Sequence, residues 1–345
     1  MTQASESYPL VSIGCAVYNG QETLARALEG VVGQSYQNLE IIICDDCSSD
    51  RSPDICQEFA DKDSRIRYMR NEKNQGIINN CNQLFRLSTG KYFMWADQDD
   101  IRDPSFVSKT VKVLEEDSRA VLCHSYTGVF QENFENQIFY STIDSTDDVK
   151  SLHLRYYRFL RNYKDTTMYG LIRSETLKDT LLWQDDLGSA NALLFELLLR
   201  GSFRQVNETL YYYAGKGLKN RPQPKDEFPR HNGGRPMPWY YMPFLAQASN
   251  QTKGILASPN NIISKIILLI ILWIDLVTVI SAKLIYRVFK ILSLNHVPNI
   301  LTNICLHLVQ DAKDIHYLVS NEELEKSCPR TWVLKNIKPT QNEHR

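Results

Sequence analysis

The chain has 345 residues, of which 43% are hydrophobic and 23% charged, as in an ordinary globular protein with one large domain or two smaller ones. Its 39 basic and 40 acidic residues give a net charge of −1, so no overall charge excess points to nucleic acid. The N-terminal stretch lacks the basic region and apolar run of a secretory signal, which predicts a globular part facing the cytosol.

Strands and helices are predicted to alternate through the first 130 residues. An apolar run at 10–18 predicts a buried strand, and apolar residues at helical spacing predict a helix at 21–34. The pattern continues with strands at 39–46, 66–74, 92–97 and 119–130, and with helices at 52–63, 76–90 and 104–117. Ser52 is expected to cap the second helix, with Pro53 at its first position. Such alternation predicts an α/β fold with a mostly parallel sheet and helices on both faces.

The second half of the chain is predicted to be more mixed. We expect a basic amphipathic helix at 151–163, a strand and a helix within 166–177, an apolar helix at 191–203 and a closing strand at 205–215. Residues 216–257 are rich in Pro, Gly and basic side chains, which predicts a linker or mobile loop. We therefore expect a main domain over 1–215 and a helical C-terminal region over 258–345.

A long apolar segment begins near residue 262. Its continuous run, 266–282, has 17 residues and is broken by Asp275, which is short and costly for a membrane span. Lys265, Lys283, Arg287 and Lys290 leave a wide apolar face, and Trp273 and Tyr286 suit an interface. We favour a helix lying in the membrane surface. The alternatives are a helix packed on the globular part or on a partner chain, and a helix that spans the membrane.

Eight cysteines are scattered along the chain. Cys44 and Cys47 have the spacing of a redox or zinc pair, but no second pair or Cys/His cluster accompanies them. We interpret the cysteines as reduced, buried thiols, with metal or redox use as the alternative.

Polar side chains follow three predicted strands where each strand ends. They are Tyr18–Asn19, Asp45–Asp46 and the run 97–100, which reads Asp-Gln-Asp-Asp. In a parallel sheet these ends converge on one edge, where ligands bind. Alternating side chains place Asp97 and Asp99 toward one pocket with Gln98 pointing away. Their oxygens suit Mg²⁺ or Mn²⁺ together with phosphate, and a divalent cation would relieve the repulsion between the acids.

The acids after the second strand have two interpretations. Asp45, Asp46, Ser48 and Asp50 lie just before the predicted helix at 52–63 and could cap it. Asp45 could instead accept hydrogen bonds from a nucleobase, while Val17, Tyr18 and Asn19 offer backbone groups and a ring to a base or ribose. Both interpretations can hold together.

The stretches "PLVSIGCAVYNGQETLARALEGVVGQSYQNLEIIICDDCSSD", "RNEKNQGIINNCNQ" and "STGKYFMWADQDDIRDP" together resemble family 2 glycosyltransferases with the GT-A fold, of the bacterial cell-surface polysaccharide type. The resemblance covers about residues 8–125 and continues more weakly to 215. It implies a nucleotide-sugar site and catalytic domain within 1–215 and makes 216–257 a linker or acceptor-side loop. The implied nucleotide-sugar site consists of Val17, Tyr18, Asn19, Asp45, Asp46, Asn74, Gly76, Asp97 and Gln98, with Asp99 and Asp97 on the metal.

The resemblance also implies an activity. A sugar would pass with inversion from a UDP-, GDP- or dTDP-sugar, a UDP-sugar being favoured, to a hydroxyl of a glycan or lipid-linked acceptor. We expect Mn²⁺ or Mg²⁺ as cofactor and no nucleic-acid partner. We also expect peripheral attachment to the inner face of the cell membrane, with homo-oligomers as an option.

The general base is the point at which this sequence departs from the family. The expected acid aligns with Ala190, which cannot take a proton. Asp185 and Asp186 lie a few residues earlier, and a shifted loop would make one of them the substitute base. The other options are a misaligned loop, an inactivating substitution or a protein that does not catalyse. The family's basic, His-containing segment is matched only by Lys216, Lys219 and Arg221, whose role stays unassigned.

Three other functions stay open from the residues alone. A nucleotidyltransferase would also use a metal on an α/β sheet, although the glycine-rich N-terminal loop that it needs is missing. A catalytically inactive sugar-nucleotide-binding or assembly subunit would explain Ala190. An α/β domain whose acidic loops bind nothing is the third option.

Overall fold

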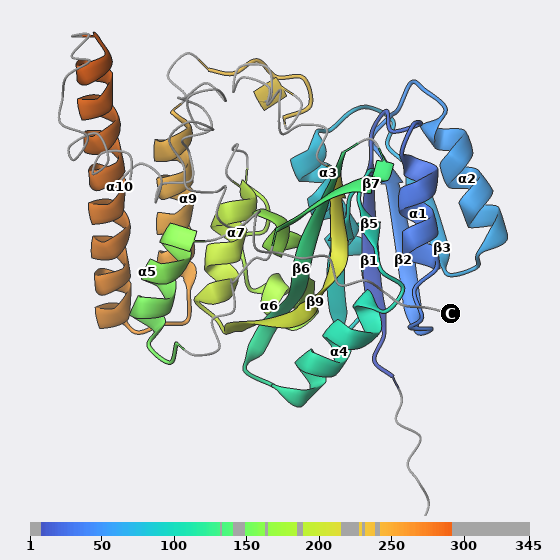
Figure 1. Cartoon of the computed structure of the whole chain (residues 1–345), viewed down its shortest axis with the longest axis horizontal. Coiled ribbons are helices and arrows are strands. Elements are labelled where there is room, and N and C mark those ends of the chain that lie inside the picture. Colours follow the sequence, from blue (N-terminus) through green and yellow to red (C-terminus); the bar gives the residue numbers. More distant parts are fainter. Residues whose placement is uncertain are drawn as a thin grey trace, which may run out of the picture. The chain divides into compact units, whose positions relative to one another are not determined.

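The computed structural model describes residues 8–131, 133–140, 149–162, 165–184, 189–214, 228–229, 232–238 and 242–291. The chain divides into two compact units, Met1–Val277 and Thr278–Arg345. The sheet and the helices packed on it lie in the first unit (Figure 1). Of the second unit the structure describes only the C-terminal part of helix α10.

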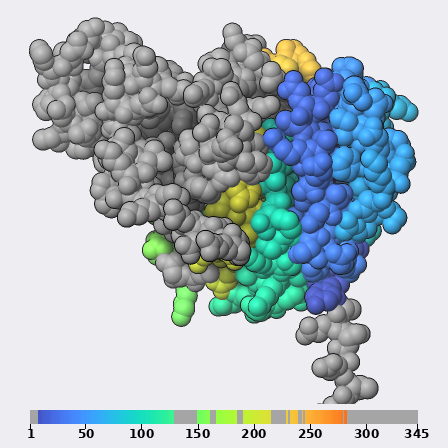
Figure 2. All heavy atoms as spheres, turned by 45° about the vertical axis from the view of Figure 1, so that its right-hand side comes forward, coloured from blue at the N-terminus to red at the C-terminus, as the bar shows by residue number. Residues whose placement is uncertain are grey.

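In the N-terminal half, strands alternate with helices, and the strands pair into a parallel sheet. Its elements are β1 (Val11–Val17), α1 (Leu24–Val32), β2 (Leu39–Asp45), α2 (Ser52–Lys62), β3 (Ile66–Arg70), α3 (Ile77–Leu87) and β4 (Tyr92–Ala96). The strands pair in the order β3-β2-β1-β4, all parallel. In the space-filling view the first described residues form a dark blue band between the lighter blue and the blue-green residues that follow them (Figure 2).

The second half extends this sheet with strands of both directions. Its elements are β5 (Ile101–Arg102), α4 (Phe106–Glu116), β6 (Ala120–Gln131), β7 (Asn133–Tyr140), α5 (Leu152–Asn162), the 3₁₀ helix η1 (Asp165–Tyr169), β8 (Leu171–Arg173), α6 (Ser174–Lys178), α7 (Ser189–Leu198), β9 (Ser202–Ala214), α9 (Pro243–Ala257) and α10 (Ile262–Ile291). The order continues β4-β8-β6-β9-β5, and β8 is antiparallel to both of its neighbours. Strands β6 and β9 therefore point the same way as β1 to β4, which confirms the mostly parallel α/β sheet.

Two apolar cores cover the two faces of the sheet, because side chains alternate along each strand. On β4, Tyr92 and Met94 join the core beneath α1 and α4, whereas Phe93 and Trp95 join the core beneath α3 and α7. The figure shows helices on both sides of the strands, as expected (Figure 1). Asp97 follows Trp95 by two residues, so the acidic turn begins on the side of α3 and α7.

Several local expectations need correction. Helix α2 begins at Ser52 with Arg51 at the N-cap and no side-chain cap, so Ser52 is not the cap. The Ser52 hydroxyl instead accepts the backbone N–H of Gly20 at 2.8 Å. Strands β5 and β7 are not predicted from the sequence, and helix α9 lies in the range where we expected a linker or loop.

Helix α10 has one buried and one exposed face within the first unit. Leu268 and Leu272 are buried in the core beneath α3 and α7, and Leu276 is buried beside them. Between positions 263 and 277, seven apolar residues at helical spacing are at least 37% exposed: Ile263, Ile266, Ile267, Ile270, Trp273, Ile274 and Val277. In the part of the chain that the structure describes, no helix reaches the length and apolarity needed to cross a bilayer.

A carboxylic acid lies inside the second of the two cores. The Glu196 side chain on α7 is 1% exposed, and its Oε2 accepts the Leu181 N–H at 3.0 Å, with Arg200 Nη1 3.8 Å away. Burial raises the pKa of Glu196 to about 7, although the Leu181 hydrogen bond and the Arg200 charge oppose this. Helix α9 passes close by, because a Cβ added to Gly254 would lie 2.5 Å from Glu196 Cγ.

We predict that Glu196 makes the folded chain less stable as pH rises. The folded pKa lies above the unfolded value of 4.5, so the folded state holds the proton more tightly and loses stability between about pH 4.5 and 7. Glu196→Gln cannot ionise, so its stability relative to the original chain should increase across that range. Urea denaturation of both proteins at pH 4.5 and pH 8 tests this. An unchanged difference between the two pH values would contradict it.

Candidate functional site

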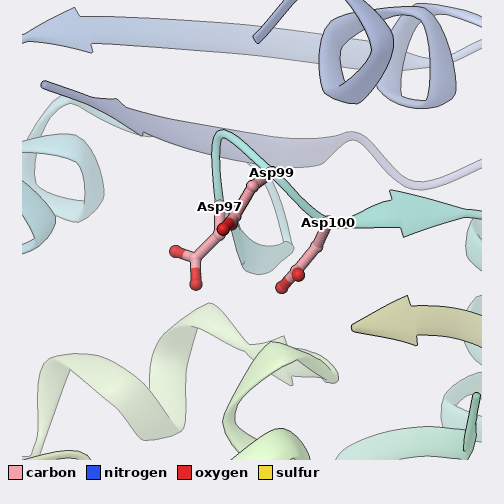
Figure 3. A group of neighbouring side chains, drawn as sticks. All are labelled: Asp97, Asp99 and Asp100. Carbon is pink, nitrogen blue, oxygen red and sulfur yellow. The ribbon is translucent and has the colours of Figure 1, made fainter. Parts of the chain in front are cut away.

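Three aspartates crowd the turn that joins β4 to β5. One carboxylate oxygen from each of Asp97, Asp99 and Asp100 lies within 4.8 Å of the others. All three carboxyl groups extend to the same side of the turn (Figure 3). Within the described ranges, this is the group of three or more His, Cys, Asp or Glu side chains whose atoms lie close enough together that they could hold a metal ion.

Burial and the neighbouring negative charges disfavour ionisation of Asp97 and Asp100 in this turn. Burial and then the Asp99 charge raise the pKa of Asp97, while a hydrogen bond from Tyr169 and the Arg102 charge oppose them. Burial, followed by the charges of Asp97 and Asp99, raises the pKa of Asp100 as well. A divalent cation between these oxygens would stabilise the ionised forms.

Asp100 differs from the other two acids in its surroundings. It is 1% exposed, accepts the Ala214 N–H at 2.9 Å, and is hydrogen-bonded by the Tyr211 hydroxyl. Arg102 lies over the Tyr211 ring at 5.1 Å and donates to the Trp95 carbonyl at 2.6 Å. Asp100 therefore fastens the acidic turn to the end of β9, a role that the sequence analysis left open.

Asp46 holds the turn that contains Asn74 and Gly76. Its carboxylate is 2% exposed and accepts the N–H groups of Gln75 and Gly76, each at 2.8 Å, and the Asn71 side-chain amide at 2.9 Å. The Asn74 side chain also accepts the Gly76 N–H, at 2.9 Å. The structure thus brings Asp46, Asn74 and Gly76 together, and the Asp46 carboxylate holds the turn through these hydrogen bonds.

Asp45 is fully buried at the end of β2. Its Oδ1 accepts the Ser48 N–H at 3.0 Å and the Ser48 hydroxyl, and its Oδ2 lies 3.1 Å from Arg70 Nε. Oδ1 is therefore hydrogen-bonded within the chain, whereas Oδ2 forms an ion pair with Arg70 but no hydrogen bond. Arg70 was not among the residues expected at the site.

The loops after β1 and β2 are joined by hydrogen bonds. Asn19, with φ 48°, donates its N–H to the Ser48 hydroxyl at 2.9 Å and accepts the Ser49 N–H on its side chain at 2.8 Å. Asp50 accepts the N–H groups of Gln21 and Ser52 at 3.0 and 2.9 Å. Of the four polar residues proposed as helix caps, Asp50 thus contacts the first residue of α2, while the side chains of Ser48 and Asp50 join the two loops.

The end of β1 presents Tyr18 to solvent. Tyr18 is 47% exposed, whereas Val17 is buried and its carbonyl accepts the Asp46 N–H at 2.8 Å. Gln98 does not point away from the other site residues, because its side-chain amide hydrogen-bonds both backbone groups of Tyr18. Tyr18, Asn19 and Gln98 are therefore brought together at one edge of the sheet.

The acceptor side of the site is described only in part. Asp185 and Asp186 lie outside the described residues, as do Lys216, Lys219 and Arg221. The segment just before Asp185 is tied to α3, because the Asn82 side chain pairs with the N–H and the carbonyl of Trp183 at 3.0 and 2.9 Å. Ala190 lies in the first turn of α7 and packs against the core.

Two tyrosines beside the acidic turn, Tyr169 and Tyr211, are not predicted from the sequence. Tyr169 hydrogen-bonds Asp97, and its ring stacks on Tyr211 at 5.5 Å. Tyr169 ends the 3₁₀ helix η1 and Tyr211 lies in β9, both far along the chain, and no local pattern connects them to the turn. Arg102 could have been found, since it follows the acids by two residues.

Comparison with known proteins identifies what this arrangement is similar to. Residues 12–176 match the family model described as "Glycosyl transferase family 2". An uncharacterized glycosyltransferase of Haemophilus influenzae is 35% identical over 127 residues, which are 37% of this chain and 39% of that protein. The Escherichia coli protein WfaP, named a UDP-Glc:alpha-D-GlcNAc-diphosphoundecaprenol beta-1,3-glucosyltransferase, is 36% identical over 106 residues, 31% of this chain and 41% of its own. The chain thus spans less than half the length of these relatives.

The fold is shared with a solved structure. Residues 1–349 of Staphylococcus aureus TarS, crystallised with UDP, superpose with a TM-score of 0.56 at 14% sequence identity. The match covers 75% of this chain and 69% of that one.

We predict that Asp46→Asn destabilises the chain by about 2–4 kcal/mol, because an amide nitrogen would face a buried N–H donor. The Asp46 carboxylate accepts three hydrogen bonds, whereas Asp61 is exposed on α2, so Asp61→Asn should change stability by less than about 0.5 kcal/mol. Chemical denaturation measures both. Equal effects of the two substitutions would show that Asp46 does not support the 74–76 turn.

Proposed function

We propose that the chain transfers a sugar from a nucleotide sugar to an acceptor hydroxyl, because residues 12–176 match the model of glycosyl transferase family 2 and the fold is shared with TarS. The observation that carries the proposal is the acidic turn at the end of β4, with three carboxylates within 4.8 Å. It lies beside Tyr18 and the 74–76 turn at the edge where a parallel sheet binds ligands.

The donor site is proposed to span these groups. Asp99 and Asp97 would hold Mn²⁺ or Mg²⁺, since hard carboxylate oxygens suit both ions. Burial first and then the Asp99 charge raise the pKa of Asp97, and a bound cation would oppose both effects. When bound, the ion would neutralise charge on the diphosphate leaving group. Tyr18 and Asn74–Gly76 would contact the nucleoside. A UDP-sugar is favoured, because UDP appears in the TarS complex and in the WfaP name.

The reaction is proposed to be a direct displacement with inversion. The acceptor oxygen forms a bond to the anomeric carbon, the bond from that carbon to the diphosphate oxygen breaks, and the acceptor proton passes to a carboxylate. Asp186, or else Asp185, is the proposed proton acceptor, because Ala190 at the start of α7 has no group that can take a proton.

Ala190 also supports a second candidate function. A chain with an intact donor site and no base would bind a sugar nucleotide without turnover. Such a protein would act as a binding or assembly subunit.

The acceptor is proposed to be lipid-linked, with the chain resting on the inner face of the cell membrane. WfaP is named for a diphosphoundecaprenol acceptor. The exposed face of α10, from Ile263 to Val277, presents seven apolar residues while the opposite face is held in the core. Trp273 on that face suits the boundary between lipid and water. A helix fixed in this way can lie along a membrane and bury its apolar face in it.

We expect the original chain to release UDP from a UDP-sugar with Mn²⁺ present, and Asp99→Ala to bind UDP with Mn²⁺ at least about 100-fold more weakly, because a metal ligand is lost. Asp61→Ala, on the exposed surface of α2, is the matched control and should leave binding unchanged. Calorimetry with Mn²⁺, with Mg²⁺ and without a metal measures this. Unchanged binding by Asp99→Ala would refute the metal assignment.

Ala190→Asp separates the two candidate functions. We expect the original chain to turn over, with Ala190→Asp altering the rate only modestly, since the base is proposed to lie at Asp186 or Asp185. Turnover only in Ala190→Asp would favour a disabled base. Tight UDP binding by both proteins, with turnover by neither when acceptors are supplied, would favour the binding subunit.

Ile270→Asp should weaken binding of the full chain to vesicles of phosphatidylglycerol and phosphatidylethanolamine by about tenfold, because it puts a charge in the middle of the exposed face of α10. Gln37→Asp adds the same charge at an exposed loop and should have no effect. Vesicle flotation measures both. If neither substitution matters, or if the original chain does not bind vesicles, the exposed face does not rest on lipid.

A further inference from the structure

Gln98 makes an unusual contact for a residue between two proposed ligands of one metal. Its Oε1 accepts the Tyr18 N–H at 2.8 Å, and its Nε2 donates to the Tyr18 carbonyl at 3.1 Å. One side-chain amide thus satisfies both backbone groups of a single residue 80 positions earlier in the chain.

This contact continues the pairing of β1 and β4 beyond the end of the strands. The last backbone pair of these parallel strands is Cys15 with Ala96. Past this point the chain turns into the acidic loop, so the backbone of β4 no longer runs beside β1. The Gln98 amide presents a donor and an acceptor as a neighbouring peptide group would, and it keeps the end of β1 attached to the acidic turn.

The close approach of Gly20 to Gln98 is separate evidence that the Gln98 amide packs against the chain just after β1. A Cβ added to Gly20 would lie 2.6 Å from both Cδ and Oε1 of Gln98, which is closer than real contacts allow. Gly20 is buried, and its own N–H is held by Ser52 at 2.8 Å, so it cannot easily move away. Glycine is therefore required here for the close approach of Gln98.

Gln98 connects two parts of the proposed donor site. Tyr18 is the proposed nucleoside contact, while Asp97 and Asp99 on either side of Gln98 are the proposed diphosphate and metal contacts. We propose that Gln98 is a positioning residue that fixes Tyr18 relative to the metal carboxylates and so couples nucleoside binding to metal binding. The inference rests on the proposed function and adds the residue that joins its two halves.

Gln98→Met tests the coupling, because it keeps the length of the side chain and removes both hydrogen bonds. The probes are Mn²⁺ alone, uridine alone, and UDP with and without Mn²⁺, measured by calorimetry on the full chain. We expect Mn²⁺ alone and uridine alone to bind within about threefold of the original chain, since each half of the site is intact. The factor by which Mn²⁺ tightens UDP binding should fall by about tenfold, the effect of losing two hydrogen bonds.

Two further variants keep the test decisive. Gly20→Ala presses on Gln98 without removing its amide and should reduce the same coupling factor, which also covers the case that Gln98→Met does not fold. Gln57→Met, on an exposed site of α2, should leave it unchanged. If the original chain binds UDP with Mn²⁺ and both site variants keep the full coupling factor, the role of Gln98 is refuted while the proposed function stands. If the original chain binds no nucleoside diphosphate, with or without Mn²⁺, the proposed function fails, and this inference fails with it.

Discussion

Repulsion among three carboxylates at the end of β4 is the constraint on which the rest of the site depends. Asp97, Asp99 and Asp100 come within 4.8 Å of one another in a turn that is partly shielded from water. Such a cluster persists only if the surrounding structure holds it, because each acid disfavours ionisation of the others. The chain supplies that support through Arg102, through the tyrosines at positions 169 and 211, and through the backbone N–H of Ala214. The turn keeps negative charge, which a divalent cation would neutralise. The cation would in turn bind a diphosphate.

The acids at this edge of the sheet divide into two groups by what their oxygens contact. Asp45, Asp46 and Asp100 are buried, and each accepts hydrogen bonds from the backbone of a neighbouring loop or strand. They shape the loops around the site. Asp97 and Asp99 lie less deeply, and they are the acids proposed to face the donor. The aspartates at the ends of two strands, β2 and β4, thus divide into three that hold neighbouring loops and two that are proposed to bind a ligand.

Much of the fold followed from the alternation of strands and helices along the sequence. It predicted the parallel pairing of β1 to β4, which places the end of β4, and so the acidic turn, at the same edge as the ends of β1 and β2. Along β4, the residues from Tyr92 to Ala96 enter the two cores by turns. The misses have physical reasons. β5 has two residues and exists only through pairing with β9, about 110 positions later, and α9 carries too many polar residues to show a helical apolar stripe. Serine is a residue type that often caps helices, but the Ser52 hydroxyl accepts a hydrogen bond from the distant Gly20 N–H instead. Partners such as Gln98 and Tyr18 are invisible to any local pattern, because the fold alone brings them together.

We propose that the acidic turn holds a divalent cation against a nucleoside diphosphate. The anomalous scattering of Mn²⁺ in crystals of the full chain grown with UDP tests this directly. We expect one Mn²⁺ peak within coordination distance of an Asp99 oxygen and of the UDP diphosphate, with the uridine near Tyr18. A bound UDP whose diphosphate lies away from Asp97 and Asp99, or a Mn²⁺ peak with no contact to either acid, would contradict it.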